Sequence, residues 1–540
     1  MNRLAATLLA AAALVPVGCT DDDSFLDGET VKSDDGKTDS SLLAMFIDVE
    51  FDGKLVTDFS FDDRNTIEDQ LLYTVGQLNG FNAVGRIDKA ELSNIKKKSV
   101  GGKTEVTYHA KLPVAWKKSA GMPTSVELKL PLDISSSGQT AFADKYKHDC
   151  VDFGAHDVDS GSMFYYYRPK QSACKIDAAD VHTVQASASP SPTQSTGKFP
   201  EYNKVWEDGT LEVLAIFGKF EDGATSGADA GIAAYNEFVS SMKRELQTKQ
   251  LTTVPANVPN APGVGAPDIE FNAVLPDGKK VHVVALMTDN VTTGLSQTAF
   301  RTRYETLSTR ADFIVYNGHA GLGTNVRALA QRGKWVKGQY VIVYMNGCDT
   351  FAYIDDALYN AHKALNPDDT TGFKYIDIVN NALPAFFASM SGATMSMFRG
   401  LLDHASPQTY EQIFRGIDSS QIVLVAGEQD NAFTPGGGGT PTTWGGLTDT
   451  GTVKKGESKK WSTPVVAAGR YTFAITGTND SDLYVRVGSA PTTSKFDCRP
   501  FKTGSNESCT VTLAQPAPIH IMVNGFSSAA SKFDITGKKD

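Results

Sequence analysis

Two apolar runs near the middle of the chain give its clearest pattern of hydrophobic positions. Residues 311–316 lead into Asn-Gly-His, and residues 340–345 lead into Asn-Gly-Cys. Short runs without alternation, rich in β-branched and aromatic residues, are typical of strands covered on both faces of a parallel sheet. The carboxyl ends of such strands meet at one edge, where the ligand crevice of open α/β sheets lies. His319 and Cys348 are therefore predicted to reach the same edge.

Strand and helix patterns alternate around these two runs. The other predicted strands are 211–218, 280–287 and 421–427, and the predicted helical stretches are 229–247, 297–310 and one or two helices within 375–403. Alternation of this kind argues for a parallel sheet with helices on both faces. We therefore predict an α/β sandwich domain at 205–435.

The region before this domain has a weaker pattern. Residues 44–51, 83–87, 104–113 and 125–130 look like strands, with a helix at 66–78. This mixture predicts a small α+β domain at 42–183, followed by a Ser/Pro/Thr-rich linker at 184–204. Its role is open between a prodomain or substrate-presenting domain and a plain surface-binding module.

The region after the α/β domain is predicted to be all-β. A Gly-rich linker at 436–446 contains four consecutive glycines, and strand-like segments then recur at short intervals. Such spacing is typical of a small β-sandwich, which we place at 447–540.

The residues at the ends of the two central runs can carry nucleophilic chemistry. A thiolate attacks a carbonyl carbon, and a neighbouring imidazole takes and then delivers the proton. Gly318 and Gly347 would let backbone amides approach the oxygen of that carbonyl. The competing interpretation of each residue is structural, with Cys348 as a small buried hydrophobe and His319 as a hydrogen-bonded core residue.

This arrangement resembles the caspase-like cysteine peptidases, and among them the gingipains most. In that family a strand ends in His, usually followed by Gly, and the next strand ends in Ala-Cys or Gly-Cys; the counterparts here are His319-Ala320-Gly321 and Gly347-Cys348. The resemblance implies a caspase-like fold for 205–435, Cys348 as nucleophile and His319 as general acid/base. It also implies the amides of Ala320 and Cys348 as oxyanion donors. Ala320 departs from the family pattern because Gly is usual there.

The C-terminal segment resembles the bacterial pre-peptidase C-terminal domain. The likeness is carried by 469–473, 479–486 and 521–526. Such modules accompany secreted peptidases, so this resemblance independently favours a peptidase. Asp480 and Asp482 are candidate calcium ligands, with solvated turn residues as the alternative. No cofactor is required by the predicted chemistry.

The start of the chain predicts export and anchoring. Residues 1–19 have the charged and apolar regions of a secretory signal, and Val15-Pro16-Val17-Gly18-Cys19 resembles a bacterial lipobox. The inference is that Cys19 carries the lipid of an outer-membrane or cell-surface lipoprotein, with ordinary secretion as the alternative. The acidic stretch 20–41 is predicted to be a disordered tether.

The remaining cysteines fit an oxidising compartment. Cys150 with Cys174 and Cys498 with Cys509 form local pairs that are expected to be disulfides. This assignment predicts that Cys348 is a thiol. A zinc site at the first pair, with His148, His156 and His182 nearby, is a weaker alternative because the spacing is not compact.

Charge and motif searches exclude other classes of protein. The net charge is −11, and no basic cluster occurs beyond Lys96 to Lys98, which argues against nucleic-acid binding. The chain has no His-Glu-x-x-His and no Gly-x-Ser-x-Gly.

The sequence thus predicts a lipid-anchored cysteine endopeptidase of the bacterial cell envelope that acts on peptides or proteins. The alternative is a non-catalytic envelope protein that keeps this fold for binding or adhesion. Asp377, Glu428 or Asp430 would favour a basic P1 residue if they line its pocket.

Overall fold

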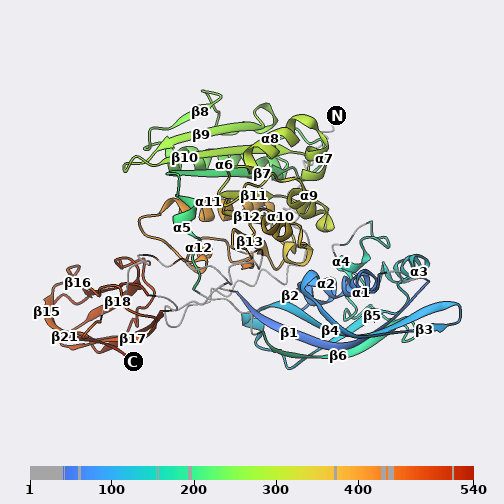
Figure 1. The fold of residues 1–540 in the computed structure, drawn as a ribbon, viewed down its shortest axis with the longest axis horizontal. Coiled ribbons are helices and arrows are strands. Elements are labelled where there is room, and N and C mark those ends of the chain that lie inside the picture. The colour runs from blue at the N-terminus through green and yellow to red at the C-terminus, as the bar shows by residue number, and fades with distance from the viewer. Residues whose placement is uncertain are drawn as a thin grey trace, which may run out of the picture.

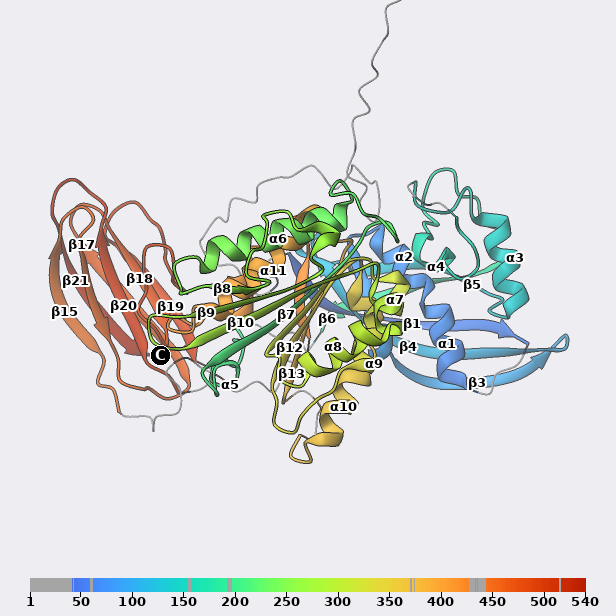
Figure 2. The same cartoon turned by 90° about the horizontal axis from the view of Figure 1, so that it is seen from above.

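The computed structural model describes residues 41, 43–58, 62–153, 155, 157–191, 197–369, 372, 374–426, 433, 435, 443–513 and 516–540. Three regions follow one another along the chain, and a central α/β body lies between two β-rich ends (Figures 1 and 2). The predicted lipidation site Cys19 and nearly all of the predicted tether lie outside the described residues. The same holds for most of the predicted Gly-rich linker.

The N-terminal region is an antiparallel sheet with helices on one face (Figure 1). Its strands are β1 (Ala44–Thr57), β2 (Ala83–Gly85), β3 (Glu91–Val100), β4 (Lys103–Lys117), β5 (Ser125–Pro131) and β6 (Val181–Pro190). Its helices are α1 (Asp63–Leu71), α2 (Tyr73–Asn79), η2 (Ile87–Lys89), η3 (Lys118–Ala120), α3 (Ser136–Tyr146) and α4 (Met163–Tyr166). The sheet order is β2-β4-β1-β6-β5, and β3 pairs with β4.

The linker predicted from residue 184 begins later in the structure. Residues 181–190 form β6, which pairs with β5 over seven residues and with β1 at its far end. Val181, Val184 and Ala186 are buried on this strand. The strand therefore has an inward-facing side, although most of its residues are small or polar. The prediction of a linker is therefore wrong for residues 184–190, because it rested on composition alone.

The central body is built on an eight-stranded sheet. Its strands are β7 (Thr210–Gly218), β8 (Thr252–Val254), β9 (Asp268–Val274), β10 (Lys280–Thr288), β11 (Phe313–Asn317), β12 (Val341–Asn346), β13 (Ile376–Asn381) and β14 (Val423–Ala426). The sheet order is β14-β13-β12-β11-β7-β10-β9-β8. Five neighbouring strands are mutually parallel, namely β13, β12, β11, β7 and β10. The strands β14, β9 and β8 are antiparallel to their neighbours.

Helices cover both faces of this sheet, as two separate apolar cores show. The helices are α5 (Tyr202–Val205), α6 (Ala230–Leu246), η4 (Gly263–Gly265), α7 (Val291–Ser296), α8 (Thr298–Ser308), η5 (Gly321–Gly323), α9 (Thr324–Arg332), η6 (Thr350–Tyr353), α10 (Ala357–Leu365), α11 (Phe387–Leu402) and α12 (Tyr410–Phe414). One core contains buried residues of α7 to α10, and the other contains those of α6, α11 and α12. Side chains of successive strand residues alternate between these cores, which explains the continuous apolar runs in the sequence.

The stretch 375–403 differs from its prediction as one or two helices. Its first part is the buried strand β13, and a single helix, α11, follows it. Residues 376–381 include an aspartate and two asparagines, and all six are buried. These polar residues hide the strand from a search for apolar runs.

The C-terminal region is a sandwich of two antiparallel sheets (Figure 1). Its strands are β15 (Leu447–Val453), β16 (Ser458–Ser462), β17 (Gly469–Gly477), β18 (Ser481–Val487), β19 (Glu507–Leu513), β20 (Ile519–Gly525) and β21 (Ser531–Lys539). The sheet orders are β15-β21-β17-β19 and β16-β20-β18, with one apolar core between them.

Candidate functional site

Strand register brings the two predicted reactive residues to one sheet edge. Asn317 of β11 and Asn346 of β12 are register partners, and the Gly318 amide donates to the Asn346 carbonyl at 3.2 Å. His319 and Cys348 each follow two residues beyond this pair. The parallel strands run in the order β10-β7-β11-β12-β13, so the chain reverses direction across the sheet between β7 and β11. A crevice outside the carboxyl ends of these two strands is where such sheets bind ligands.

Gly347 lets the two loops touch. A Cβ atom at this position would lie 2.6 Å from the Gly318 carbonyl oxygen and 3.4 Å from the Ala320 amide nitrogen. The first distance is too short for any side chain. The loop that carries Cys348 therefore packs backbone to backbone against the loop that carries His319.

A backbone carbonyl orients His319. Its Nε2 lies 3.0 Å from the Phe220 carbonyl oxygen, just beyond β7. A carbonyl only accepts, so this bond requires the proton on Nε2 and leaves Nδ1 as the basic nitrogen. The His319 ring also packs against the rings of Phe220, at 5.2 Å between centroids, and Phe387, at 4.9 Å. The imidazole is thus held in one orientation and one tautomer.

The Phe220 loop is itself fixed by the N-cap of α6. Asp229 accepts from the amides of Phe220 at 3.1 Å and Glu221 at 2.9 Å, and it also caps the helix through Ile232. Sequence reasoning missed Phe220 because its backbone, not its side chain, contacts the imidazole. The Asp before a predicted helix at 229 was the available signal.

Cys348 is buried beside the start of α11. Its side chain is 5% exposed, and its sulfur lies 3.6 Å from the Ala385 carbonyl oxygen. The sulfur is also engaged in a disulfide. The prediction of a thiol at this position is therefore wrong for this structure. A search for pairs that are close in sequence does not detect disulfides between cysteines that are far apart along the chain.

An apolar cluster covers this edge. Ala385, Phe387 and Met390 are buried, with Phe220 and Ala230 packed against them. An apolar cover strengthens electrostatic interactions at the edge because it excludes water. The Ala320 residue is also buried, and its amide lies against the Gly347 loop, while its role as oxyanion donor stays a prediction.

The residue after Cys348 is a buried acid that sequence reasoning did not single out. Asp349 has a φ of 51° and no exposed surface, and its carboxylate faces Tyr165, Asn79 and Arg168 of the N-terminal region. Burial raises its pKa to about 7, against the lowering effect of Arg168. Because Tyr165 and Arg168 belong to the N-terminal region, this acid lies where that region meets the central body.

The N-terminal region contacts the segment that directly follows Cys348. Phe46 of β1 and Arg86 both pack on the Phe351 ring, at 6.2 Å between centroids and 5.4 Å from the guanidinium carbon. Lys89 forms an ion pair with Asp356 at 2.6 Å. The two regions therefore meet at η6, next to the candidate site.

Of the three acids considered for a P1 pocket, the structure describes only Asp377, and it is not brought to this edge. Asp377 lies on β13 and accepts from the hydroxyls of Tyr340 at 2.6 Å and Tyr410 at 2.5 Å. It is 1% exposed, so it serves the buried core instead of a substrate pocket. Glu428 and Asp430 lie outside the described residues.

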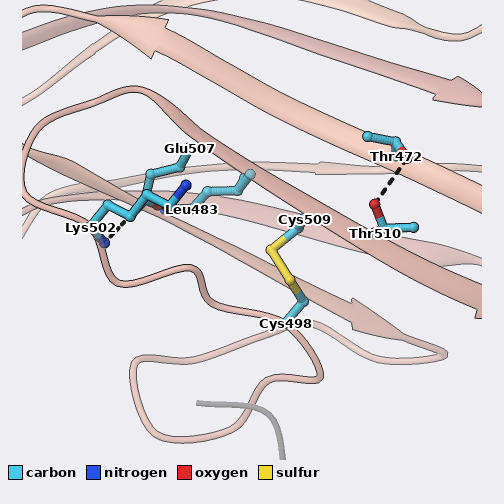
Figure 3. Close-up of a disulfide and its surroundings, with 7 residues drawn as sticks. All are labelled: Thr472, Leu483, Cys498, Lys502, Glu507, Cys509 and Thr510. Atoms are coloured by element: carbon cyan, nitrogen blue, oxygen red, sulfur yellow. Dashed lines mark hydrogen bonds between the residues drawn. A yellow bond between two sulfur atoms is a disulfide. The ribbon is translucent and has the colours of Figure 1, made fainter. Parts of the chain in front are cut away.

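Two local disulfides are present. Cys150 joins Cys174, and Cys498 joins Cys509, with the second bridge linking a loop to β19 (Figure 3). Next to it, Glu507 accepts from the amides of Leu483 and Lys502, and Thr472 bonds Thr510 across β17 and β19 (Figure 3). The first bridge consumes both thiolates that the alternative zinc site needed, so that alternative is wrong for this structure.

The candidate calcium ligands have protein partners. Asp480 accepts from the Gly504 amide at 3.1 Å, and Asp482 pairs with Arg499 at 3.1 Å. Within the described part of the chain, no group of three or more His, Cys, Asp or Glu side chains is arranged to hold a metal ion. Calcium binding stays a prediction. None of the helices that the structure describes is long and apolar enough to cross a membrane.

The fold and the site define a protein with an imidazole and a sulfur at the carboxyl edge of a parallel sheet, followed by a β-sandwich. Residues 458–525 match the family model described as bacterial pre-peptidase C-terminal domain. The match confirms the resemblance predicted for the C-terminal region, and it covers β16 to β20.

Curated relatives share only this segment. The "Virulence metalloprotease" of Vibrio anguillarum is 50% identical over 52 residues, which are 10% of this chain and 8% of that protein. The "Zinc metalloprotease" of Helicobacter pylori is 41% identical over 69 residues, which are 11% of this chain and 27% of that protein. This chain thus spans less than a third of either relative. Their protease names apply to proteins that share the C-terminal domain with this chain.

Two of the solved structures that are similar match short parts of the chain. The pre-peptidase C-terminal domain of a collagenase from Bacillus anthracis is 12% identical, with a TM-score of 0.15, and the match covers 17% of this chain and 88% of that one. A periplasmic inhibitor of g-type lysozyme from Aeromonas hydrophila is 12% identical, with a TM-score of 0.16, over 18% of this chain and 94% of that one.

Proposed function

We propose that this protein is a cysteine endopeptidase of the bacterial cell envelope, with Cys348 as nucleophile and His319 as general acid/base. The observation that carries the proposal is the register of β11 and β12, which sends both residues to the same edge of the sheet. The strand order and the resemblance to caspase-like peptidases in the two Asn-Gly segments support it. The C-terminal match to a domain found in named proteases supports a peptidase independently.

The reaction starts from the reduced sulfur. A thiol reductant gives two electrons to the disulfide of Cys348, which leaves Cys348 and its former partner as thiols. Nδ1 of His319 then accepts the Cys348 proton, because Nε2 is occupied by the Phe220 carbonyl. The pairing of a thiolate with an imidazolium lowers the pKa of the thiol below its ordinary value near 8.5.

The proposed cleavage has two halves. The thiolate forms a C–S bond to the peptide carbonyl carbon, and the carbonyl electron pair moves to the oxygen near the Ala320 and Cys348 amides. When the C–N bond breaks, the imidazolium gives its proton to the leaving amine. Water, activated by the neutral imidazole, then attacks the thioester, releases the acid and restores the thiol.

The alternative function is a non-catalytic envelope protein that uses this fold for binding. The engaged, 5% exposed sulfur of Cys348 favours it, because a buried disulfide cannot attack a substrate. In both proposals the protein acts at the bacterial cell envelope, and peptides or proteins are the ligands.

The deciding experiment measures thiol reactivity and cleavage together. After mild reduction, alkylation of Cys348 by iodoacetamide is followed against pH by mass spectrometry in wild type and His319→Ala, beside a mixed fluorogenic peptide library. The endopeptidase predicts fast alkylation below pH 7 that His319→Ala abolishes, and library cleavage that Cys348→Ala removes. Alkylation that follows an ordinary thiol in both proteins, without cleavage, would leave the binding protein as the function.

A further inference from the structure

A buried pair of side-chain amides lies beneath the candidate site. Asn317 and Asn346 end the two strands that precede His319 and Cys348, and both are fully buried. The Asn346 Nδ2 donates to the Asn317 Oδ1 at 2.8 Å. Amides at fully buried strand positions are unfavourable unless they are hydrogen-bonded, so packing alone would favour apolar residues here.

The pair is tied to the helix that covers the edge. The Thr394 hydroxyl of α11 donates to the Asn317 Oδ1 at 2.9 Å, and the Asn346 Nδ2 also lies 3.3 Å from the Met390 carbonyl of the same helix. This helix begins at Phe387, whose ring packs on His319. One set of bonds therefore links both strand ends to the element that contacts the imidazole.

Three further hydrogen bonds fix the Cys348 side. Gln421 donates from Nε2 to the Asn346 Oδ1 at 3.2 Å. Thr350, two residues after Cys348, donates to the Met345 carbonyl at 2.7 Å and accepts from the Asn381 amide at 2.9 Å. The turn that contains Cys348 is thus held on both sides by buried hydrogen bonds.

We propose that Asn317, Asn346 and Thr394 are positioning residues that set the distance and orientation between the His319 imidazole and the Cys348 sulfur. The proposal rests on the proposed function, because it concerns the geometry of that dyad. A single residue separates each asparagine from its reactive residue, so a shift of either strand end moves the reactive group directly. Catalytic groups must be held within a fraction of an ångström, and buried hydrogen bonds supply rigidity of that kind. Of the two asparagines, Asn346 uses both its side-chain oxygen and its nitrogen, whereas only the oxygen of Asn317 is bonded among the described residues.

Thr394 offers a matched pair of variants that touch neither reactive residue. Thr394→Val removes the hydroxyl donor at nearly constant volume, and Thr394→Ser keeps the hydroxyl. We expect Thr394→Val to lower the rate of Cys348 alkylation at pH 6.5 and the kcat for a cleaved peptide by about five- to tenfold, with KM within about twofold. We expect Thr394→Ser to stay within about twofold of wild type in all three measurements.

The readouts separate a positioning role from a structural one. The alkylation rate and the cleavage kinetics of each variant are measured on reduced full-length protein. Thermal unfolding is the control for correct folding. A Thr394→Val protein that melts at a lower temperature but keeps the wild-type alkylation profile and kcat would overturn the proposal. Asn346→Leu is the stronger variant, and Thr394→Val decides the question if Asn346→Leu does not fold.

The same data distinguish this proposal from the proposed function. If wild-type alkylation is fast below pH 7 and depends on His319, the dyad stands, and only the response of Thr394→Val decides the network's role. If wild-type alkylation ignores His319, the dyad itself fails and the positioning role fails with it.

Discussion

At the scale of single residues, the candidate site depends on one very close backbone approach. Gly347 allows the Cys348 loop to lie against the Gly318 carbonyl, where a Cβ atom would be only 2.6 Å away. That contact comes from strand pairing over long sequence distance, so nothing in the local sequence specifies how close the loops are. The Asn-Gly dipeptides gave the only sign of it.

Gly347→Ala is expected to destabilise the protein by about 1–3 kcal/mol, since the new methyl group must push the two loops apart. Gly392 on α11 is the matched control, because a Cβ there meets nothing within 4 Å. Gly392→Ala is expected to stabilise the protein by about 0.5–1 kcal/mol through helix propensity. Urea denaturation of both variants measures the difference, and equal effects of the two substitutions would contradict the close contact.

Asp349 makes stability depend on pH. Its folded pKa is raised to about 7 by burial, so between about pH 4 and 7 the folded protein holds a proton that the unfolded chain has lost. This group therefore costs stability progressively as pH rises through that window. The side chain of Asp349→Asn does not titrate. From pH 5 to pH 8 the free energy of unfolding of wild type should therefore fall by roughly 2–4 kcal/mol relative to that of Asp349→Asn.

Denaturation of the two proteins at both pH values measures that change. Asp144→Asn is the control, because Asp144 is an exposed acid that pairs with Lys147 on the helix surface. A constant difference between Asp349→Asn and wild type at pH 5 and pH 8 would show that the carboxyl is solvated.

At the scale of elements, the N-cap of α6 connects helix stability to the site. Asp229→Ala removes the acceptor of three amides, including those of Phe220 and Glu221, and is expected to cost about 1–2 kcal/mol. Asp229→Asn keeps one side-chain oxygen and should lose less. If the Phe220 carbonyl orients His319, Asp229→Ala also slows the alkylation of Cys348 in reduced protein. A loss of stability with unchanged alkylation would show that the Phe220 loop does not orient the imidazole.

The elements that the sequence predicted are those with apolar patterns of their own. The strands β7, β10, β11 and β12 and the helices α6 and α8 lie where periodicity indicates them. The helix predicted at 66–78 is two helices, α1 and α2, that meet at Leu72. The strand β3 was missed because nearly all of its residues are exposed, so it carries no buried face to detect.

The site was predictable only where side chains carry its chemistry. His319 and Cys348 follow apolar strands, and that pattern is visible in sequence. The Phe220 carbonyl, the buried Asp349 and the Thr394 hydroxyl contribute through contacts between distant elements. Those contacts depend on tertiary packing, which a single sequence does not encode locally.

At the scale of the whole molecule, the C-terminal sandwich is docked on the central body. Arg486 is 2% exposed and donates to the carbonyls of Ser406 and Pro407, at 3.3 and 2.7 Å. Gln412 of α12 donates to Asp497 of the sandwich at 2.7 Å. Buried polar contacts of this kind oppose independent motion of the two regions.

Arg486→Ala is expected to loosen this docking, because it leaves two carbonyls without their donor, and to cost about 2–3 kcal/mol. Scanning calorimetry should then resolve the sandwich as a separate transition from the central body. Arg470→Ala is the control, since Arg470 is exposed on β17 and pairs with Asp540. Identical traces for the two variants would mean that the interface contributes nothing to cooperativity.

The strand β3 lies at the margin of the N-terminal sheet, where a row of backbone donors and acceptors faces outward. Lys96, Lys97 and Lys98 occupy this strand next to an irregularity in its pairing with β4. Charge and irregular pairing both discourage a strand from another molecule from adding to such a margin. The three lysines therefore disfavour edge-to-edge pairing of this strand with a strand of another molecule, a role in solubility that their charge alone did not indicate.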